Sequence, residues 1–320
     1  MLPSLSIVIP TYNRAQYVGT AIESCFGALK VGFPLEIIVT DNASQDDTSR
    51  VVAGTMHETV RYFRNKENIG PVRNVMQGLR AASGTYVVLL SDDDWWTEDG
   101  FDHLARLLSK SPTLGAAASS LNVRDAANSD AFVAVQGYYS RDEVFTERSE
   151  ALRCLFLRSH ILSGLIIRRD LLDFGGAEKH MESLYPQMYL FGRALTLEDS
   201  AYSTRPLINH RMNNKVYWEY STDHMTSAVI NIIRDLTEEM PHGWRVARSL
   251  IRERAHYATT PLVRQREEGI AQFVNVARQL LKIPEYRRLP IIWIYICYIG
   301  VFGKLGIGVA RCVQRRIRTS

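Results

Sequence analysis

Three consecutive carboxylates, Asp92, Asp93 and Asp94, follow the apolar run 86–90 and are the residues of this chain most suited to chemistry. Carboxylates this close repel one another, and either water or a bound cation must relieve that repulsion. Mg²⁺ and Mn²⁺ prefer carboxylate oxygen, keep open coordination positions and bridge to a diphosphate. A solvated turn that caps the next helix explains the triplet as well, so the triplet alone favours neither interpretation.

Polar loops follow two other apolar runs. The loop 10–14 contains Tyr12, whose ring could stack on a base, and the second loop opens with Asp41, whose carboxylate could accept from a base N–H or a ribose hydroxyl. Arg73 follows a Gly-Pro turn early in an expected helix. Taken singly, each of these residues is also explained by packing or by an ordinary surface charge.

The elements that must position these residues alternate between strand and helix over the first 120 residues. Short apolar runs predict strands at 5–10, 36–41, 60–64, 86–90 and 114–120, and helical periodicity predicts helices at 14–30, 44–56, 70–82 and 97–110. This alternation indicates parallel βαβ units with helices on both faces of a sheet. In such sheets a ligand binds at the carboxyl ends of the strands, where the polar loops lie.

The second half of the chain is less regular. Residues 121–147 are polar and are expected to form an irregular insertion, and strands are expected at 162–168 and 202–209. The pattern becomes helical over 222–240 and 244–282.

Composition excludes several classes of protein. The 320 residues carry a net charge of +4, which is too small to indicate a nucleic-acid partner. The four cysteines lie far apart without metal-ligand spacing, so neither a zinc site nor a disulfide framework is expected, and a reducing cytoplasm is the expected compartment. No Gly-x-Gly-x-x-Gly follows the first strand, which argues against a dinucleotide-dependent oxidoreductase. The Gly-rich basic loop of sugar-phosphate nucleotidyltransferases is absent as well.

The C-terminal segment is basic and apolar. Residues 282–320 contain eight Lys or Arg and one acid, and the apolar run 291–303 is thirteen residues long. A membrane span needs about 20 apolar residues, so an interfacial segment is expected, with Trp293, Tyr295 and Tyr298 at headgroup depth. A helix buried against the domain or against a second subunit is the alternative, and a homodimer is left open.

Four segments, 7–14, 38–48, 67–74 and 89–96, together resemble the family-2 glycosyltransferases of GT-A fold. The resemblance implies an α/β fold with a Rossmann-like and mostly parallel sheet flanked by helices. The helical pattern adds a helical C-terminal region. A looser resemblance to the abequosyltransferase-like subgroup of O-antigen assembly rests on the strand 163–169, the Tyr185-Pro186 turn and the Asn213-Asn214 loop.

The resemblance also implies a domain organisation. Residues 1–120 form the nucleotide-sugar-binding half of the GT-A domain, and residues 121–221 form its acceptor-side half. The resemblance does not cover the tail. There the helical pattern predicts a helical extension over residues 222–283, and composition predicts a basic, hydrophobic membrane-surface segment over residues 284–320.

Carried over residue by residue, the resemblance assigns a donor site and a metal site. The expected donor-binding residues are Pro10, Thr11, Tyr12, Asp41, Arg73 and Asp92. Asp93 is the expected ligand of Mg²⁺ or Mn²⁺. Asp94 is its rival, because Ser91 stands where the family motif has its first acid.

The catalytic base is where the sequence departs from the family. The family usually carries a Glu-Asp pair some 90 residues after the metal motif, and residues 185–187 here read Tyr-Pro-Gln. Glu182 is the expected base of an inverting transfer and Glu178 is the next nearest acid. If neither lies near the donor, a retaining, front-face reaction becomes the better account. His210 is expected to be structural.

These inferences predict a metal-dependent glycosyltransferase that moves a sugar from a nucleotide-diphosphate donor to a hydroxyl of a lipid-linked or polysaccharide acceptor. The expected setting is cell-surface glycan synthesis, of O-antigen or exopolysaccharide, in the cytoplasm at the inner face of the cell membrane. The alternatives are a retaining, abequosyltransferase-like transfer of a deoxy sugar and a non-catalytic sugar-nucleotide-binding protein.

Overall fold

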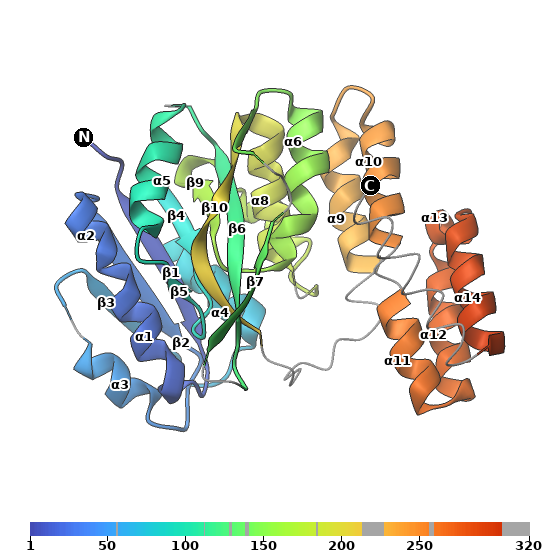
Figure 1. Cartoon of the computed structure of the whole chain (residues 1–320), viewed down its shortest axis with the longest axis horizontal. Helices are drawn as coiled ribbons and strands as arrows, with labels where there is room; N and C mark the ends of the chain where they lie inside the picture. The colour runs from blue at the N-terminus through green and yellow to red at the C-terminus, as the bar shows by residue number, and fades with distance from the viewer. Residues whose placement is uncertain are drawn as a thin grey trace. The chain divides into compact units, whose positions relative to one another are not determined.

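The computed structural model describes residues 1–55, 57–111, 113–127, 130–137, 141–183, 185–212, 227–255 and 259–302. The chain divides into two compact units, Met1–Tyr217 and Trp218–Ser320. Figure 1 shows an α/β unit at the N-terminus and, at the C-terminus, a unit whose described elements are helices.

One continuous sheet forms the centre of the first unit, in the order β3-β2-β1-β4-β9-β6-β10-β5. Its strands are β1 (Leu5–Thr11), β2 (Leu35–Asp41), β3 (Val60–Arg64), β4 (Tyr86–Leu89), β5 (Trp95–Trp96), β6 (Ala116–Asp125), β9 (Leu165–Arg168) and β10 (Ser200–Met212). β1 to β4 are parallel, and so are β6 and β10. The loops after β1, β2 and β4 therefore meet at one edge of the sheet, as the alternating pattern predicts.

β9 runs antiparallel between β4 and β6. Leu165, its first residue, pairs with Leu89 near the end of β4. The turn that leads into β9 is therefore brought to the same edge of the sheet as the loop after β4.

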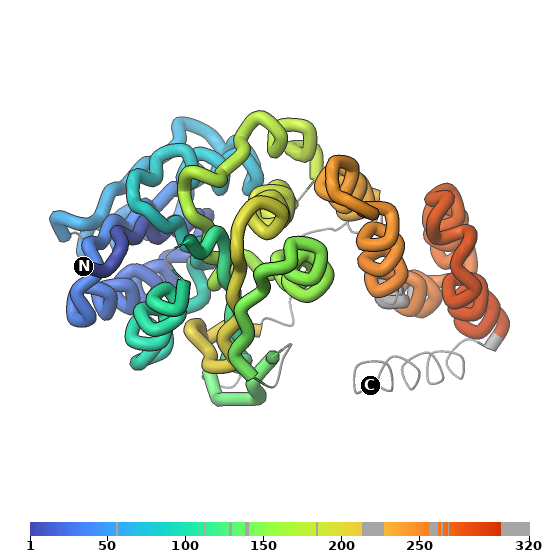
Figure 2. The backbone as a smooth tube through the Cα atoms, turned by 90° about the horizontal axis from the view of Figure 1, so that it is seen from above, coloured from blue at the N-terminus to red at the C-terminus, as the bar shows by residue number. Residues whose placement is uncertain are grey.

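Helices cover both faces of the sheet. They are α1 (Ala15–Cys25), α2 (Gly27–Val31), α3 (Thr48–Gly54), α4 (Pro71–Ala81), α5 (Gly100–Ser109), α6 (Arg148–Leu155), α7 (Phe174–Glu178) and α8 (Pro186–Leu197). Alternate β1 residues, such as Ile7, enter a core with Ile22 of α1 and Phe101 of α5. Val8 points to the other face, where a Cβ at Gly78 of α4 would clash with its Cγ1. Figure 2 shows the path of these helices from above.

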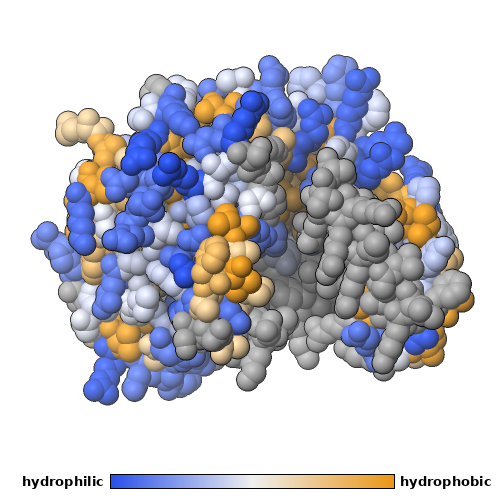
Figure 3. Space-filling model, in the orientation of Figure 1, coloured by the Kyte–Doolittle hydropathy of each residue, from blue (hydrophilic) through white to orange (hydrophobic). Residues whose placement is uncertain are grey.

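The segment 121–147 differs from the irregular insertion that its polarity predicts. β6 continues to Asp125, β7 (Ala131–Gln136) pairs with β6, and β8 (Glu143–Phe145) pairs with β10. The alternation of apolar and polar residues that marks a half-buried strand is missing from β7, because its apolar residues Phe132, Val133 and Val135 are all exposed. These side chains form the apolar patch that Figure 3 shows over this strand.

The second unit consists of α9 (Val229–Glu238), α10 (Gly243–Ala255), α11 (Thr259–Glu268), α12 (Ile270–Lys282), α13 (Pro284–Arg287) and α14 (Pro290–Phe302). The predicted helical C-terminal region is thereby confirmed. In the part of the chain that the structure describes, no helix is long and apolar enough to cross a membrane. The basic residues from Lys304 onward and the Asn213-Asn214 loop lie outside the described residues.

α14 has two apolar faces. Ile292, Tyr295 and Ile299 are buried, and α14 contacts α11, α12 and α13. The expectation that Tyr295 lies at headgroup depth is therefore wrong, because Tyr295 shares the buried face with residues three and four positions away. The exposed face carries Trp293, Ile294, Cys297, Tyr298 and Val301.

Candidate active site

The acidic triplet belongs to a four-residue turn, Ser91–Asp94, which is separated from β4 by Leu90 alone. The N–H of Asp94 donates to the carbonyl of Ser91 at 3.1 Å, which places Asp92 and Asp93 at the two central positions of the turn. The Ser91 hydroxyl donates to Oδ1 of Asp93 at 2.8 Å. The turn thus presents two adjacent carboxylates at the edge of the sheet where the loops meet.

Burial and mutual repulsion shift both carboxylates. The pKa of Asp92 rises to about 7 because the group is buried and lies beside the charge of Asp93. The Arg14 charge, the Thr11 side chain and the Tyr12 backbone N–H oppose that rise. Burial and the charge of Asp94 raise the pKa of Asp93 as well. A cation beside Asp92 and Asp93 would favour their charged forms.

Asp92 and Asp93 suit a divalent cation that is shared with a diphosphate. Arg14 already places positive charge beside both, with Nε 3.9 Å from Oδ1 of Asp92 and Nη1 3.9 Å from Oδ2 of Asp93. Among the described residues, no group of three or more His, Cys, Asp or Glu side chains is arranged to hold a metal ion. Mg²⁺ is commonly held by one or two carboxylates together with substrate phosphates. The donor set therefore fits a cation whose coordination a substrate completes.

Asp94 is held differently from its two neighbours. Its Oδ2 accepts from the Ser163 hydroxyl at 2.5 Å and from Nδ1 of His210 at 3.0 Å, and its Oδ1 accepts from the N–H of Arg211 at 2.8 Å. The buried Asp94 carboxylate, which was predicted as the rival metal ligand, thus accepts hydrogen bonds from three protein donors. The geometry leaves Asp92 and Asp93 as the more accessible pair.

His210 lies against Asp94. Burial lowers the pKa of His210, but the hydrogen bond to Asp94 and the charges of Asp94 and Asp93 outweigh burial and raise it overall. The ring therefore tends to carry a proton and to offset the negative charge of the turn.

Asp41 ends β2 with a fully buried side chain. Its Oδ1 accepts from the N–H of Ser44 at 2.8 Å, and its Oδ2 accepts from the Tyr62 hydroxyl at 2.5 Å. Nε of Arg64 lies 3.6 Å from Oδ2. Burial and the Asp41 carboxylate raise the pKa of Tyr62. Both oxygens of Asp41 thus organise the protein itself, and a contact with a base stays a prediction.

The other donor-binding candidates lie at the same edge. Thr11 is buried at the end of β1, Pro10 is partly buried, and Tyr12 is 38% exposed in the loop that follows. Arg73 is exposed in the first turn of α4 and makes no hydrogen bond or ion pair with the described residues. Tyr12 and Arg73 are therefore both accessible to a ligand.

A network of four asparagines holds the loop before α4, and sequence reasoning missed it. Asn42 donates to Asn68 at 2.7 Å, and Asn65 donates to Asn42 at 3.3 Å and to Asn74 at 3.1 Å. Asn74 in turn donates to the carbonyl of Thr40 at 2.7 Å. The network ties the ends of β2 and β3 to the start of α4, close to Arg73.

The two acids proposed as bases are not drawn into the acidic turn. Arg80, in the last turn of α4, donates to Glu178 at 2.9 Å. We call the edge where the loops after β1, β2 and β4 meet the ligand edge of the sheet. Because α4 begins at the ligand edge and ends just before β4 starts, this ion pair lies at the opposite edge. Glu182 is exposed before α8 and makes no hydrogen bond or ion pair with the described part of the chain. α8 leads into the start of β10, so its N-terminus, which follows Glu182, points to the ligand edge.

Arg211 joins the site through contacts that sequence reasoning did not foresee. Its guanidinium forms two 2.6 Å hydrogen bonds to Asp130 and donates to the Asp93 carbonyl at 2.7 Å. The Tyr17 and Trp95 rings lie 4.4 and 4.7 Å from the guanidinium carbon. The available signal was that Arg211 follows a predicted strand, at the arginine of an Arg-x-His pattern that the family carries and that reads Arg211-Met212-Asn213 here.

The sequence profile of glycosyl transferase family 2 matches residues 6–165, half of the chain and all of the segment that builds the acidic turn. The chain therefore belongs to glycosyl transferase family 2. The predicted class of enzyme, a glycosyltransferase, is thereby confirmed.

Two curated relatives are similar over part of this region. The GalNAc(5)-diNAcBac-PP-undecaprenol beta-1,3-glucosyltransferase of Campylobacter jejuni is 40% identical over 96 residues, which are 29% of this chain and 30% of the relative. The abequosyltransferase RfbV of Salmonella typhimurium is 33% identical over 98 residues, which are 30% of this chain and 29% of the relative. The chain thus aligns with less than a third of the length of either relative, and the looser resemblance to abequosyltransferases is confirmed as a resemblance.

A solved structure confirms the fold. TarS from S. aureus, residues 1–349 in complex with UDP-GlcNAc, superimposes with a TM-score of 0.66 at 16% identity, over 99% of this chain and 90% of that TarS fragment. The mixed sheet with flanking helices is therefore the GT-A arrangement that the sequence predicts.

Proposed function

We propose that the chain transfers a sugar from a nucleotide-diphosphate donor to a hydroxyl of a lipid-linked or glycan acceptor, with the help of Mg²⁺ or Mn²⁺. The observation that carries the proposal is the turn Ser91–Asp94, which presents Asp92 and Asp93 at the ligand edge of the sheet. Two carboxylates of raised pKa, with Arg14 beside both, form a site that favours a divalent cation and a diphosphate.

The residues at this edge take separate roles in the proposal. Asp93 would hold the cation together with Asp92, whose carboxylate would also face the ribose side of the donor. Tyr12 and Arg73 would contact the nucleotide. When bound, the cation supplies positive charge that stabilises the departing diphosphate. Asp94 stays bound to the protein.

The acceptor must lose a proton as its oxygen attacks the anomeric carbon. We assign that proton to Glu182, because Glu178 is paired with Arg80 at the opposite edge. The proposed reaction is therefore inverting. A retaining transfer, as the similarity to an abequosyltransferase would suggest, is the outcome that contradicts it.

The acceptor is proposed to be lipid-linked and presented at a membrane surface. One relative is named for GalNAc(5)-diNAcBac-PP-undecaprenol, a lipid-linked glycan. The exposed apolar face of α14, with Arg287 and Arg288 exposed just before it, suits the headgroup region of an anionic bilayer. We propose that the protein works at the inner face of the cell membrane.

A thermal-shift screen tests the donor site. Uridine, guanosine, cytidine, adenosine and thymidine diphosphates are added with and without Mn²⁺. A ligand that binds only the folded state raises its Tm, so one or more nucleotides should do so with Mn²⁺ present. The corresponding nucleotide sugars are then tested for hydrolysis or transfer. Binding without any turnover would favour the non-catalytic alternative, and no stabilisation by any nucleotide would contradict the proposal.

A further inference from the structure

The hydroxyl of Ser163 joins the two ends of the acidic turn. It accepts from the N–H of Ser91 at 2.9 Å and donates to Oδ2 of Asp94 at 2.5 Å. Ser163 is fully buried, and it lies 69 residues from Asp94 along the chain. One buried hydroxyl thus bridges the first and last residues of the turn whose two central residues are Asp92 and Asp93.

Ser163 is itself held on both sides. Gly164 has φ +77°, a conformation that favours glycine, and its N–H donates to the carbonyl of Leu89 at 2.9 Å. The carbonyl of Ser163 accepts from Nη2 of Arg158 at 3.0 Å. Arg158 is fully buried and also donates to the carbonyl of Ile161 at 3.3 Å. These contacts hold the Ser163 backbone in one position, so the Ser163 hydroxyl can hold the turn in place.

Asp92 and Asp93 repel each other, so a turn with free ends would relax by moving the two carboxylates apart. A cation that binds both carboxylates must then draw them together again, and the free energy needed for that movement weakens its binding. A turn whose ends are tied holds the carboxylates in place before the cation arrives. The bridge at Ser163 ties Ser91 and Asp94, and the Asp94 carboxylate is further held by His210 and Arg211.

We propose that Ser163 is a positioning residue that acts through Asp94 and sets the affinity of the Asp92–Asp93 pair for a divalent cation. The inference rests on the proposed cation site and adds a determinant from the turn before β9. It also assigns Asp94 to anchoring the turn and not to the cation.

The test measures Mn²⁺ binding directly, by the electron paramagnetic resonance signal of free Mn²⁺ in titrations of the full-length chain. Ser163→Ala removes the bridge and should weaken Mn²⁺ binding about tenfold, as expected for a lost hydrogen bond to a charged group. Asp94→Asn should weaken it similarly. If Ser163 acts through Asp94, the double variant should be little weaker than either single variant, because the two effects share one interaction.

Two further variants separate positioning from packing. Ser163→Cys leaves no cavity but is a weak donor, so it should follow Ser163→Ala. Ser203→Ala removes another buried hydroxyl, bound to the backbone at residue 205 near the opposite end of β10, and should leave Mn²⁺ binding unchanged. Thermal unfolding identifies the folded variants, and Ser163→Cys replaces Ser163→Ala if the latter does not fold.

The outcomes distinguish this inference from the proposed function. Equal Mn²⁺ affinity in the wild type and the folded Ser163 variant would overturn the positioning role and leave the cation site standing. A double variant about a hundredfold weaker than the wild type would show independent effects and overturn the action through Asp94. A wild-type chain that binds no Mn²⁺ would overturn the cation site, and the inference with it.

Discussion

Asp93 is the residue at which charge matters most for the proposed transfer. Asp93→Asn keeps the size of the side chain but holds a cation poorly, so transfer should fall by at least ~10²-fold, or about 2.7 kcal/mol of barrier. Initial rates with the donor found in the screen measure the effect. Asp47→Asn is the control, because Asp47 is an exposed acid before α3. Near-normal turnover of Asp93→Asn, with and without a chelator, would contradict metal dependence.

Asp92 should make the stability of the cation-free protein fall as pH rises. Its pKa is about 7 in the folded chain and lower in the unfolded chain, so between about pH 4 and pH 7 the unfolded chain binds fewer protons. The contribution of Asp92 to the free energy of unfolding therefore decreases through this range and is constant above it. Asp92→Asn should remove this contribution to the decrease and be more stable than the wild type at pH 8, on the order of a few kcal/mol at most. Urea unfolding from pH 5 to pH 8 measures this, and parallel curves for the two proteins would contradict it.

Glu182 carries the proposed proton transfer. Glu182→Gln should slow transfer by about 10²–10⁴-fold and leave donor binding unchanged, because an amide cannot take the acceptor proton. Glu178→Gln is the matched control, since its carboxylate pairs with Arg80 on the surface. NMR of the product gives its anomeric configuration. Retention, together with a mild effect at Glu182, would replace the inverting mechanism with a retaining one.

At the scale of elements, local pattern predicted the parallel half of the sheet. The runs 5–10, 36–41 and 86–90 are short, apolar and bounded by polar loops, and each became a buried strand. These features are local, so the sequence displays them directly. The edge at which Asp41 and the acidic turn meet follows from the parallel order.

Contacts between distant segments could not be predicted in the same way. The donors that hold Asp94 come from residues 69, 116 and 117 positions later, so nothing near the triplet marks Asp94 as an anchor. The sequence likewise predicted that the Asp41 carboxylate contacts a nucleobase, and nothing near Asp41 showed that Tyr62, on a neighbouring strand, donates a hydrogen bond to it. The antiparallel course of β9 has the same origin, because strand direction depends on the connection and not on the composition of the strand.

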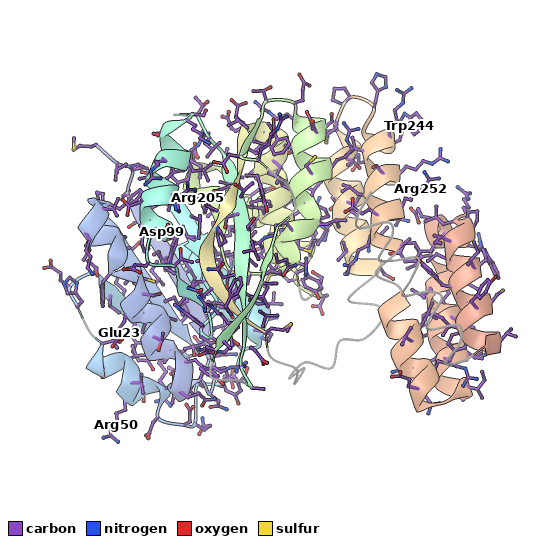
Figure 4. All side chains as sticks on the ribbon, viewed as in Figure 1. Glu23, Arg50, Asp99, Arg205, Trp244 and Arg252 are labelled. Carbon is purple, nitrogen blue, oxygen red and sulfur yellow. The ribbon has the colours of Figure 1, made fainter. Side chains whose placement is uncertain are left out.

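The exposed apolar face of α14 should contact lipid and strengthen the binding of the protein to vesicles. Trp293→Ser should weaken binding to vesicles of phosphatidylcholine and phosphatidylglycerol, because Trp293 lies 45% exposed on that face. Trp244→Ser is the matched control, since Trp244 is 62% exposed on α10, outside α14, as Figure 4 shows. Flotation in a sucrose gradient measures the bound fraction. If Trp293→Ser left flotation unchanged and converted a dimer to a monomer in light scattering, a second copy would be the occupant of this face.

At the scale of the whole molecule, charge is divided unevenly along the chain. Residues 1–281 carry a net charge of −3 and residues 282–320 carry +7. An anionic surface should therefore attract the C-terminal segment and repel the rest. The +4 of the complete chain conceals this division.

The division predicts how vesicle binding depends on lipid and salt. The intact chain should float with vesicles that contain phosphatidylglycerol and much less with pure phosphatidylcholine, because each Lys or Arg near an anionic surface contributes about 1 kcal/mol. Added NaCl should weaken that binding, since charges are screened beyond about 8 Å at physiological ionic strength. Trp293→Ser should lower the bound fraction at every salt concentration and keep the salt dependence, because it removes apolar contact and no charge. Flotation that is equal on both kinds of vesicle and insensitive to salt would show that the basic segment does not contact the bilayer.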